Sequence, residues 1–185
     1  MQTKGEYLIA APRDAVWAAL NDPAVLQQCI PGCESFNAAE GGRFEAMVAA
    51  SVGPVRASFK TSIALEELEP PQRYSLVGEG RSGAAGFAKG RADVHLVAEG
   101  EQTRLHYSTT FQVGGRLAQV GSRLVVAATR KTTDEFFAAF TRHLEYGTAP
   151  ADARMTAAAP TFNWRMLAAV AAALLVAGIL LWTVL

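Results

Sequence analysis

Residues 104–145 read RLHYSTTFQVGGRLAQVGSRLVVAATRKTTDEFFAAFTRHLE, and the spacing of the apolar residues changes within this stretch. Before Val113, apolar and polar residues alternate, which is typical of a strand with one covered face. From Gly115 to Glu145 the apolar residues recur every three or four positions, which predicts a helix of about 45 Å. The residues of this apolar stripe are Leu117, Val120, Leu124, Ala128, Phe136, Phe140 and Leu144. The stretch therefore predicts a sheet that is followed by one long helix.

The two-residue alternation runs back from Val113 to Glu34 and is interrupted by five turn signals. These are Gly41-Gly42, Gly53-Pro54, Pro70-Pro71, the stretch 83–86 and Gly100-Glu101. They predict about six antiparallel strands in series. Upstream, residues 2–10 predict an edge strand, and Pro12 and Asp22-Pro23 each begin a short helix. The predicted fold class is α+β, an antiparallel sheet that wraps around a long C-terminal helix.

Composition excludes several classes of protein. The chain has 185 residues, of which 50% are hydrophobic, so it is not disordered by composition. Its 17 basic and 17 acidic residues give a net charge of zero, whereas nucleic-acid binding usually needs a basic surface. Two cysteines are too few for a disulfide-rich secreted fold.

The last 20 residues, MLAAVAAALLVAGILLWTVL, contain no charged side chain. A helix of that length spans about 30 Å, the thickness of a bilayer core, which predicts a transmembrane anchor. A buried core helix is the alternative. Arg142, Arg154 and Arg165 precede the span, so the positive-inside rule predicts that the N-terminal side lies in the cytoplasm. The N-terminus has no apolar run of signal-peptide length. We therefore expect a domain over 1–146, a flexible linker over 147–163, and an anchor over 164–185 in the cytoplasmic membrane.

Small residues are frequent on the predicted covered face of the sheet, among them Ala57 and Ala92. They either let the long helix approach closely or leave room for an apolar ligand. The second interpretation predicts a pocket that is lined by Trp17, Phe59, Gly78, Gly80, Phe87, Phe111, Leu117 and Val120. Gly114 and Gly115, with Arg116, form either a tight turn or a place for an anion at the mouth of that pocket.

The sequence offers few catalytic groups. Cys29 and Cys33 lack nearby histidines and do not make a zinc site, which needs three or four ligands. His95 and His106 fall on the solvent face of the sheet, and the run Glu66, Glu67 and Glu69 is typical of a solvated strand end. We therefore predict no catalytic residue and no metal site. A candidate partner-binding patch consists of Arg123, Arg130 and Lys131, although a solvated helix face is the alternative.

Several motifs occur in an order that resembles a known family. They are Ile30-Pro31-Gly32-Cys33-Glu34, Pro70-Pro71-Gln72-Arg73-Tyr74, Gly78-Glu79-Gly80, Gly86-Phe87-Ala88-Lys89-Gly90, the segment VGGRLAQVGSRLV over 113–125, Phe136-Phe137 and Phe140. In these motifs residues 1–145 resemble the G-subunit family of carbon monoxide dehydrogenase, within the START-like (SRPBCC) superfamily.

The resemblance implies a helix-grip fold with an internal apolar pocket. It also implies a non-enzymatic accessory protein that recruits a molybdenum-containing hydroxylase, such as carbon monoxide dehydrogenase, to the cytoplasmic membrane. An alternative is a carrier that holds a quinone or lipid and links that enzyme to the membrane lipids. A small cyclase- or hydrolase-type enzyme on the same fold is a further alternative. No cofactor is expected beyond such a bound quinone or lipid.

Overall fold

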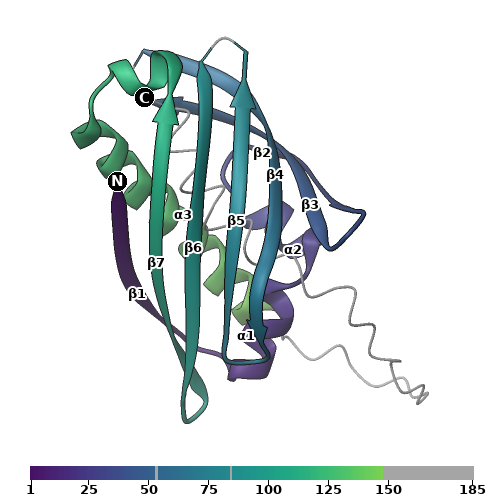
Figure 1. Ribbon diagram of the computed structural model, residues 1–185. Coiled ribbons are helices and arrows are strands. Elements are labelled where there is room, and N and C mark those ends of the chain that lie inside the picture. Colours follow the sequence, from purple (N-terminus) through teal and green to yellow (C-terminus); the bar gives the residue numbers. More distant parts are fainter. Residues whose placement is uncertain (53, 84, 148–185) are drawn as a thin grey trace.

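The computed structural model describes residues 1–52, 54–83 and 85–147 (Figure 1). The predicted membrane anchor, and the predicted linker from residue 148 on, lie outside these residues. The elements are β1 (Gln2–Ile9), α1 (Arg13–Leu20), α2 (Pro23–Cys29), β2 (Cys33–Ala39), β3 (Arg43–Val52), β4 (Val55–Glu69), β5 (Arg73–Ser82), β6 (Gly86–Glu99), β7 (Gln102–Gly114), the 3₁₀ helix η1 (Gly115–Gln119) and α3 (Ser122–Gly147).

The described strands form one antiparallel sheet of seven strands in the order β1-β7-β6-β5-β4-β3-β2. This confirms the predicted meander, to which the N-terminal strand is added beside the last strand. The sheet curves around α3 (Figure 1), whose backbone lies nearest to α2, β1 and β3. We call the end that holds η1, the β3–β4 turn and the β5–β6 turn the η1 end, and the opposite end, with α1 and α2, the α1 end.

The alternation along the strands sorts the side chains as predicted. Even positions of β5, such as Tyr74 and Leu76, are buried on the concave face. Odd positions, such as Arg73 and Val77, are exposed on the convex face. Antiparallel sheets commonly keep one face in water, so the core is a single apolar layer between the sheet and α3.

The long helix differs from its prediction. It is interrupted at Gly121, whose φ of +102° is accessible to glycine at little cost, so η1 and α3 are separate elements. The interruption also shifts the phase of the apolar stripe. Leu124 is 52% exposed, whereas its neighbour Val125 is buried. Within the part of the chain that the structure describes, no helix combines the length and hydropathy that crossing a bilayer requires.

Tyr7 joins the N-terminal strand to α3. Its hydroxyl donates a hydrogen bond of 2.5 Å to Oδ1 of Asp134, and its ring stacks on Phe137 with centroids 4.0 Å apart. Burial, followed by the bond to Asp134, raises the pKa of Tyr7 above its usual value, so the phenol stays protonated and remains a donor. The contact fixes one edge of the sheet against the helix.

The β5–β6 turn fits tightly against η1. Gly86 has a φ of +113°, and a Cβ at this position would lie 2.1 Å from the carbonyl oxygen of Gly114. The backbone N–H of Leu117 donates to the carbonyl of Ala85 at 3.2 Å, which holds η1 on the turn. Of the two interpretations of the Gly114-Gly115 pair, the structure therefore supports the tight turn.

This close approach predicts that Gly86→Ala lowers the free energy of unfolding by about 2 kcal/mol or more, because a strained φ alone costs about 1–3 kcal/mol. Gly83→Ala is the matched control in the same turn, since nothing lies within 4 Å of a Cβ there. Urea unfolding followed by circular dichroism measures both variants. Equal stability of the two variants would contradict the tight fit.

Candidate functional site

The side chains on the concave face of the sheet differ in size between its two ends. At the α1 end it carries large side chains, including Tyr74, Leu76 and Leu96, all buried. Towards the η1 end the strand register places small residues side by side. One row joins Thr61 to Gly80 and Ala88 across β4, β5 and β6, and the next row joins Gly78 to Gly90, with the larger Ile63 and Phe111 on either side of them. The sheet is therefore shallow along β5 and β6 at this end, between larger side chains on the neighbouring strands.

The buried face of α3 shows the same change. Its C-terminal half inserts a group of large apolar residues, namely Phe136, Phe137, Phe140 and Leu144. Its N-terminal half buries the smaller Val125, Thr129 and Thr133. The small buried side chains of the helix thus lie at the same end of the domain as the small residues of β5 and β6, and we call this end of the core the small-residue half. The aromatic side chains fill the core at the α1 end.

A hollow of about 240 Å³ opens between α3 and β3 on this small-residue half. We call it the α3–β3 hollow. Three walls line it: the turn before β2, the end of β3 and one flank of α3. Its lining residues are Pro31, Gly32, Ala49, Ala50, Ser51, Val52, Ala128, Lys131, Thr132 and Glu135. It is the candidate mouth of a site between sheet and helix.

Three buried hydroxyl groups on the concave face have no hydrogen-bond partner among the described residues. They are Oγ1 of Thr3, Oγ1 of Thr61 and Oη of Tyr74, whose residues are 6%, 0% and 2% exposed. Burial raises the pKa of Tyr74 well above its usual value, so this phenol remains a potential donor. Burying a hydroxyl without a partner costs about 1–3 kcal/mol, so each group is an available contact for a bound polar atom.

Most of the predicted pocket residues lie on the covered side of the sheet. Trp17 meets Tyr74 edge-on at 5.5 Å at the α1 end, whereas the buried Leu117 belongs to η1 at the other end. Buried Phe59, Gly78, Gly80 and Phe111 lie on the strands between these ends, and Val120 is half-buried. From Tyr74 to Gly80 the strand rises about 20 Å, so these residues are spread along the face. Their role in a pocket stays a prediction.

Phe87 does not join them. Its side chain is 38% exposed and lies over Gly114, where an added Cβ would come within 2.2 Å of the ring. The alternation explains this placement, because position 87 shares the convex face with Lys89 and Arg91. Placing Phe87 in an internal pocket is therefore wrong.

The predicted partner-binding residues are all exposed but do not form one patch. Burial and then Asp134 raise the pKa of Tyr107, while Arg130 lowers it, so Arg130 lies on the flank of α3 that faces β1 and β7. Lys131 lies on the other flank, where it lines the α3–β3 hollow and pairs with Glu135 at 3.8 Å. Arg123 is in the first turn of α3, near η1. A role of these residues in binding stays a prediction.

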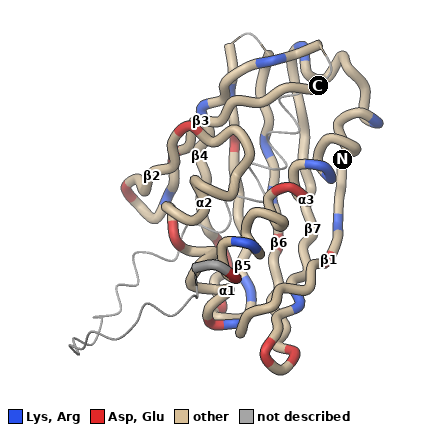
Figure 2. The backbone as a smooth tube through the Cα atoms, turned by 180° about the vertical axis from the view of Figure 1, so that it is seen from behind, with Lys and Arg blue, Asp and Glu red and all other residues tan. Residues whose placement is uncertain are grey.

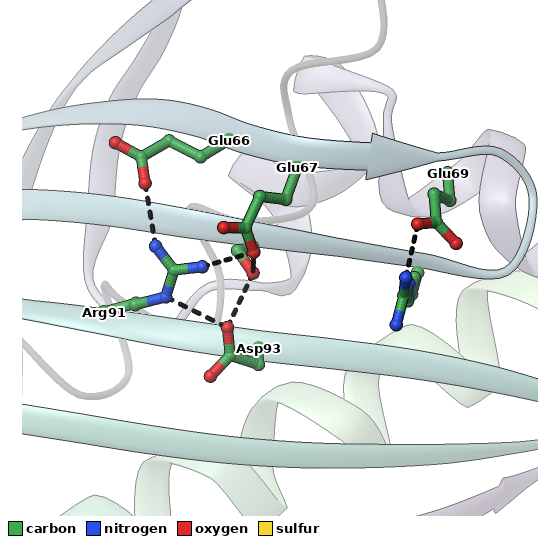
Figure 3. Close-up of polar contacts among 7 residues, drawn as sticks. Glu66, Glu67, Glu69, Arg91 and Asp93 are labelled. Atoms are coloured by element: carbon green, nitrogen blue, oxygen red, sulfur yellow. Dashed lines mark hydrogen bonds and ion pairs between the residues drawn. The ribbon is translucent and has the colours of Figure 1, made fainter.

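On the convex face, Arg91 ties two strands together (Figure 3). Its guanidinium contacts Glu66 at 2.8 Å and Glu67 at 2.6 Å on β4, and Asp93 at 3.1 Å on its own strand. Ser75, on the strand between, donates to Asp93 at 2.6 Å. The glutamates are therefore members of an ion-pair network, whereas the sequence suggested only a solvated strand end. Arg73 pairs with Glu69 in the same region.

The two thiols are poorly suited to nucleophilic chemistry. Burial raises the pKa of Cys29 to about 11 and that of Cys33 to about 11, and the thiolate is the reactive form. His95 and His106 are neighbours on the convex face, with ring centroids 6.3 Å apart. No group of three His, Cys, Asp or Glu side chains within residues 1–52, 54–83 and 85–147 is arranged to hold a metal ion.

Comparison of the sequence with known protein families identifies the family of this chain. The sequence model of the family described as the G subunit of carbon monoxide dehydrogenase (CoxG) matches residues 5–145. The chain belongs to the CoxG family. The resemblance that the motifs suggested is thereby confirmed. A search of curated proteins finds no significant match to this CoxG-family chain.

Solved structures share the fold of this CoxG-family domain. A conserved protein from Geobacillus kaustophilus is 24% identical with a TM-score of 0.76, over 80% of this chain and 97% of its own. A protein from Thermus thermophilus is 16% identical with a TM-score of 0.61, over 80% and 100%. The ZhuI aromatase/cyclase from Streptomyces sp. R1128 is 15% identical with a TM-score of 0.60, over 83% and 99%. At these identities the likeness shows a START-like fold alone.

Sequence reasoning did not single out two parts of this CoxG-family site. Nothing in a strand pattern shows that the hydroxyls of Thr61 and Tyr74 lack partners, because that depends on which side chains meet them. The motif Ile30-Pro31-Gly32 was a signal for the α3–β3 hollow. Gly32 has a φ of +73°, and its carbonyl accepts a 2.8 Å hydrogen bond from Ala49, which forms the wall of the hollow beside β3.

The unpartnered hydroxyl predicts that Thr61→Val leaves stability unchanged or raises it by about 1 kcal/mol, since the substitution removes a buried polar group and keeps the shape. Thr129→Val is the matched control. That hydroxyl is also buried, but it donates to the carbonyl of Val125 at 3.0 Å, so its loss is expected to destabilise the chain. Denaturant titration of both variants gives the comparison. A larger loss for Thr61→Val than for Thr129→Val would show that the Thr61 hydroxyl has a partner in solution.

Proposed function

We propose that this CoxG-family chain is a membrane-bound accessory protein that brings a molybdenum hydroxylase of the carbon monoxide dehydrogenase type to the cytoplasmic membrane. The observation that carries the proposal is the family match over residues 5–145, in a chain whose residues 166–185 contain no charge. The family description connects the chain with carbon monoxide dehydrogenase. The uncharged run has the length of a transmembrane helix.

The arrangement of charges supports an orientation with the domain in the cytoplasm. Arg142, Arg154 and Arg165 all precede the apolar run. Basic residues near a span stay on the cytoplasmic side. Carbon monoxide dehydrogenase would then meet the domain in the same compartment, and the linker would leave the domain free to turn towards it.

We further propose that the chain catalyses no reaction of its own. The carboxylates of Glu66, Glu67 and Asp93 neutralise Arg91 and are held by ion pairs, so none is a free general base. The raised pKa of Cys29 and of Cys33 disfavours the thiolate. These contacts favour structural roles for the groups that catalysis would most readily use.

Recruitment predicts a specific result for Leu174→Arg/Leu175→Arg, which places two charges in the centre of the apolar run. Each charge at the centre of a span costs about 2.5–3.5 kcal/mol, so the variant is expected to stay out of the membrane. Carbon monoxide dehydrogenase activity should then move from the membrane fraction to the soluble fraction. Leu174→Ile/Leu175→Ile is the control and should behave like the wild type. Membrane-bound enzyme activity in the Arg variant would contradict recruitment by this chain.

A second candidate function is a carrier for a quinone or lipid, and the unpartnered hydroxyl of Thr61 favours it. A quinone offers a carbonyl oxygen to such a donor, while its ring and tail suit the apolar surface beside Gly78 and Gly80. The α3–β3 hollow would be its way in. An apolar ligand gains about 25 cal/mol for each Å² that it removes from water.

A carrier function predicts that an organic extract of the purified chain contains quinone or lipid that mass spectrometry detects. Gly80→Leu fills the concave face next to Thr61 and is expected to abolish the bound ligand. Gly83→Leu adds the same side chain to an exposed turn and is expected to retain it. A clean extract from the wild type, with strong destabilisation by Gly80→Leu, would mean that the helix packs directly on the sheet and nothing is carried.

A further inference from the structure

The η1 end of the domain is strongly basic although the chain is neutral. Three segments meet there: residues 51–60 of the β3–β4 hairpin, residues 79–90 around the β5–β6 turn, and residues 112–124 from the end of β7 to the start of α3. Their charged residues are Arg56, Lys60, Arg81, Lys89, Arg116, Arg123 and Glu79. The segments therefore carry a net charge of +5 in a chain whose net charge is 0.

The remaining chain is correspondingly acidic. Viewed from the α3 side, the uppermost part of the domain shows mainly Lys and Arg, whereas Lys and Arg are mixed with most of the Asp and Glu further down (Figure 2). This separation of charge gives the domain an electric polarity along α3. A one-signed patch of this kind accelerates association with a partner of opposite charge.

Most of the basic side chains at the η1 end are not neutralised within the domain. Arg81 pairs with Glu79 at 2.6 Å and Lys60 pairs with Glu45 at 3.6 Å. The other four form no ion pair within the described part of the chain, and all are exposed: Arg56, Lys89, Arg116 and Arg123. Their charges are therefore directed at solvent or at a partner.

Two large apolar side chains are exposed at the same end of the domain. Phe87 is 38% exposed on β6, and Leu124 is 52% exposed on the first turn of α3. Exposed apolar side chains together with charged ones are typical of a protein–protein interface. The same composition also suits the surface of an anionic membrane. The position of the chain's C-terminal side distinguishes the two.

α3 runs from the η1 end to the α1 end, as Figure 1 shows. Its 26 residues make it about 39 Å long, so Gly147, from which the chain continues, is that far from the η1 end. If residues 166–185 anchor the chain, the chain leads to the membrane from the end of the domain opposite the basic one. The basic end can then face a protein in the cytoplasm while the anchor is in the bilayer, which favours the protein partner.

We propose that the η1-end surface, formed by Arg56, Lys89, Arg116, Arg123, Phe87 and Leu124, docks an acidic face of the recruited enzyme. The inference rests on the proposed function and deepens it, because it names the surface and the chemistry of the partner. It also replaces the patch expected from the sequence. Arg123 remains in the surface, whereas Arg130 and Lys131 lie on the flanks of α3.

The test uses the full-length chain in nanodiscs of neutral phosphatidylcholine, with purified carbon monoxide dehydrogenase holoenzyme as the probe. Biolayer interferometry measures the association and dissociation rates at low and high salt. Arg56→Glu/Arg116→Glu/Arg123→Glu is expected to slow association by about tenfold or more at low salt, and to remove most of its salt dependence. Lys4→Glu/Arg43→Glu/Arg142→Glu is the matched control, with the same change of charge at exposed positions elsewhere, and should stay within about twofold of the wild type.

A second pair of variants tests the exposed apolar side chains of the surface. Leu124→Ser is expected to speed dissociation by about tenfold, because loss of a desolvated anchor acts on the dissociation rate. Leu8→Ser, at a side chain that is 48% exposed on β1, should leave the rate unchanged. Equal rates for these two variants would overturn the apolar part of the surface.

The outcomes separate the surface from the function. If the wild type does not bind the enzyme at all, the proposed function fails and the docking surface fails with it. If the wild type binds and both charge variants bind equally well, the enzyme docks elsewhere and only the surface is wrong. Nanodiscs of anionic phosphatidylglycerol test whether the η1-end surface binds lipid instead of the enzyme. Loss of enzyme binding by the wild type in these discs would show that the η1 end lies on lipid, whereas retained binding supports the protein interface.

Discussion

The packing of α3 against the concave face of the sheet is the interaction on which the rest of the structure depends. One sheet has a single covered face, and one helix supplies most of its cover. Phe136, Phe137 and Phe140 anchor that helix at the α1 end, where the sheet presents large side chains. Their burial contributes apolar stabilisation and dispersion contacts at that end. These aromatic side chains therefore fix the helix on the sheet at the α1 end. The η1 end is available for binding a ligand or a partner.

The η1 end has two surfaces that could serve binding, one on the inside of the domain and one on the outside. On the inside, small residues of β5 and β6 and the small buried residues of α3 lie at this end, and the α3–β3 hollow opens between α3 and β3. On the outside, the turns that close this end carry the unpaired basic side chains. The same strand ends thus hold the candidate ligand mouth and the proposed docking surface close together. A carrier that exchanged its ligand with a bound enzyme would need that proximity.

The sequence predicted what depends on periodicity and missed what depends on contacts. Alternation along β5 and β7 identified the covered face, because a strand's side chains point to opposite faces in turn. The same rule places Phe87 on the convex face, outside the pocket. Its aromatic side chain led to the wrong prediction that it lines the pocket. The break at Gly121 was hidden because three-four spacing continues through it, and only the backbone angle separates η1 from α3. The unpartnered hydroxyl of Thr61 has no counterpart in the pattern, since it depends on residues far away in the chain.

The pairing of β1 with β7 has a consequence for synthesis on the ribosome. Gln2 lies opposite Thr110 and Ile9 lies opposite Thr103, so the first strand made is paired with the last. The N-terminal strand has no partner until about 100 further residues have been translated, which takes roughly 5–20 s at ordinary elongation rates. During that interval its backbone donors and acceptors form an open edge of the kind that promotes association between nascent chains. Timely completion of β7 is thus a requirement for avoiding aggregation, and a translational pause between the codons of β6 and β7 would be especially harmful to this fold.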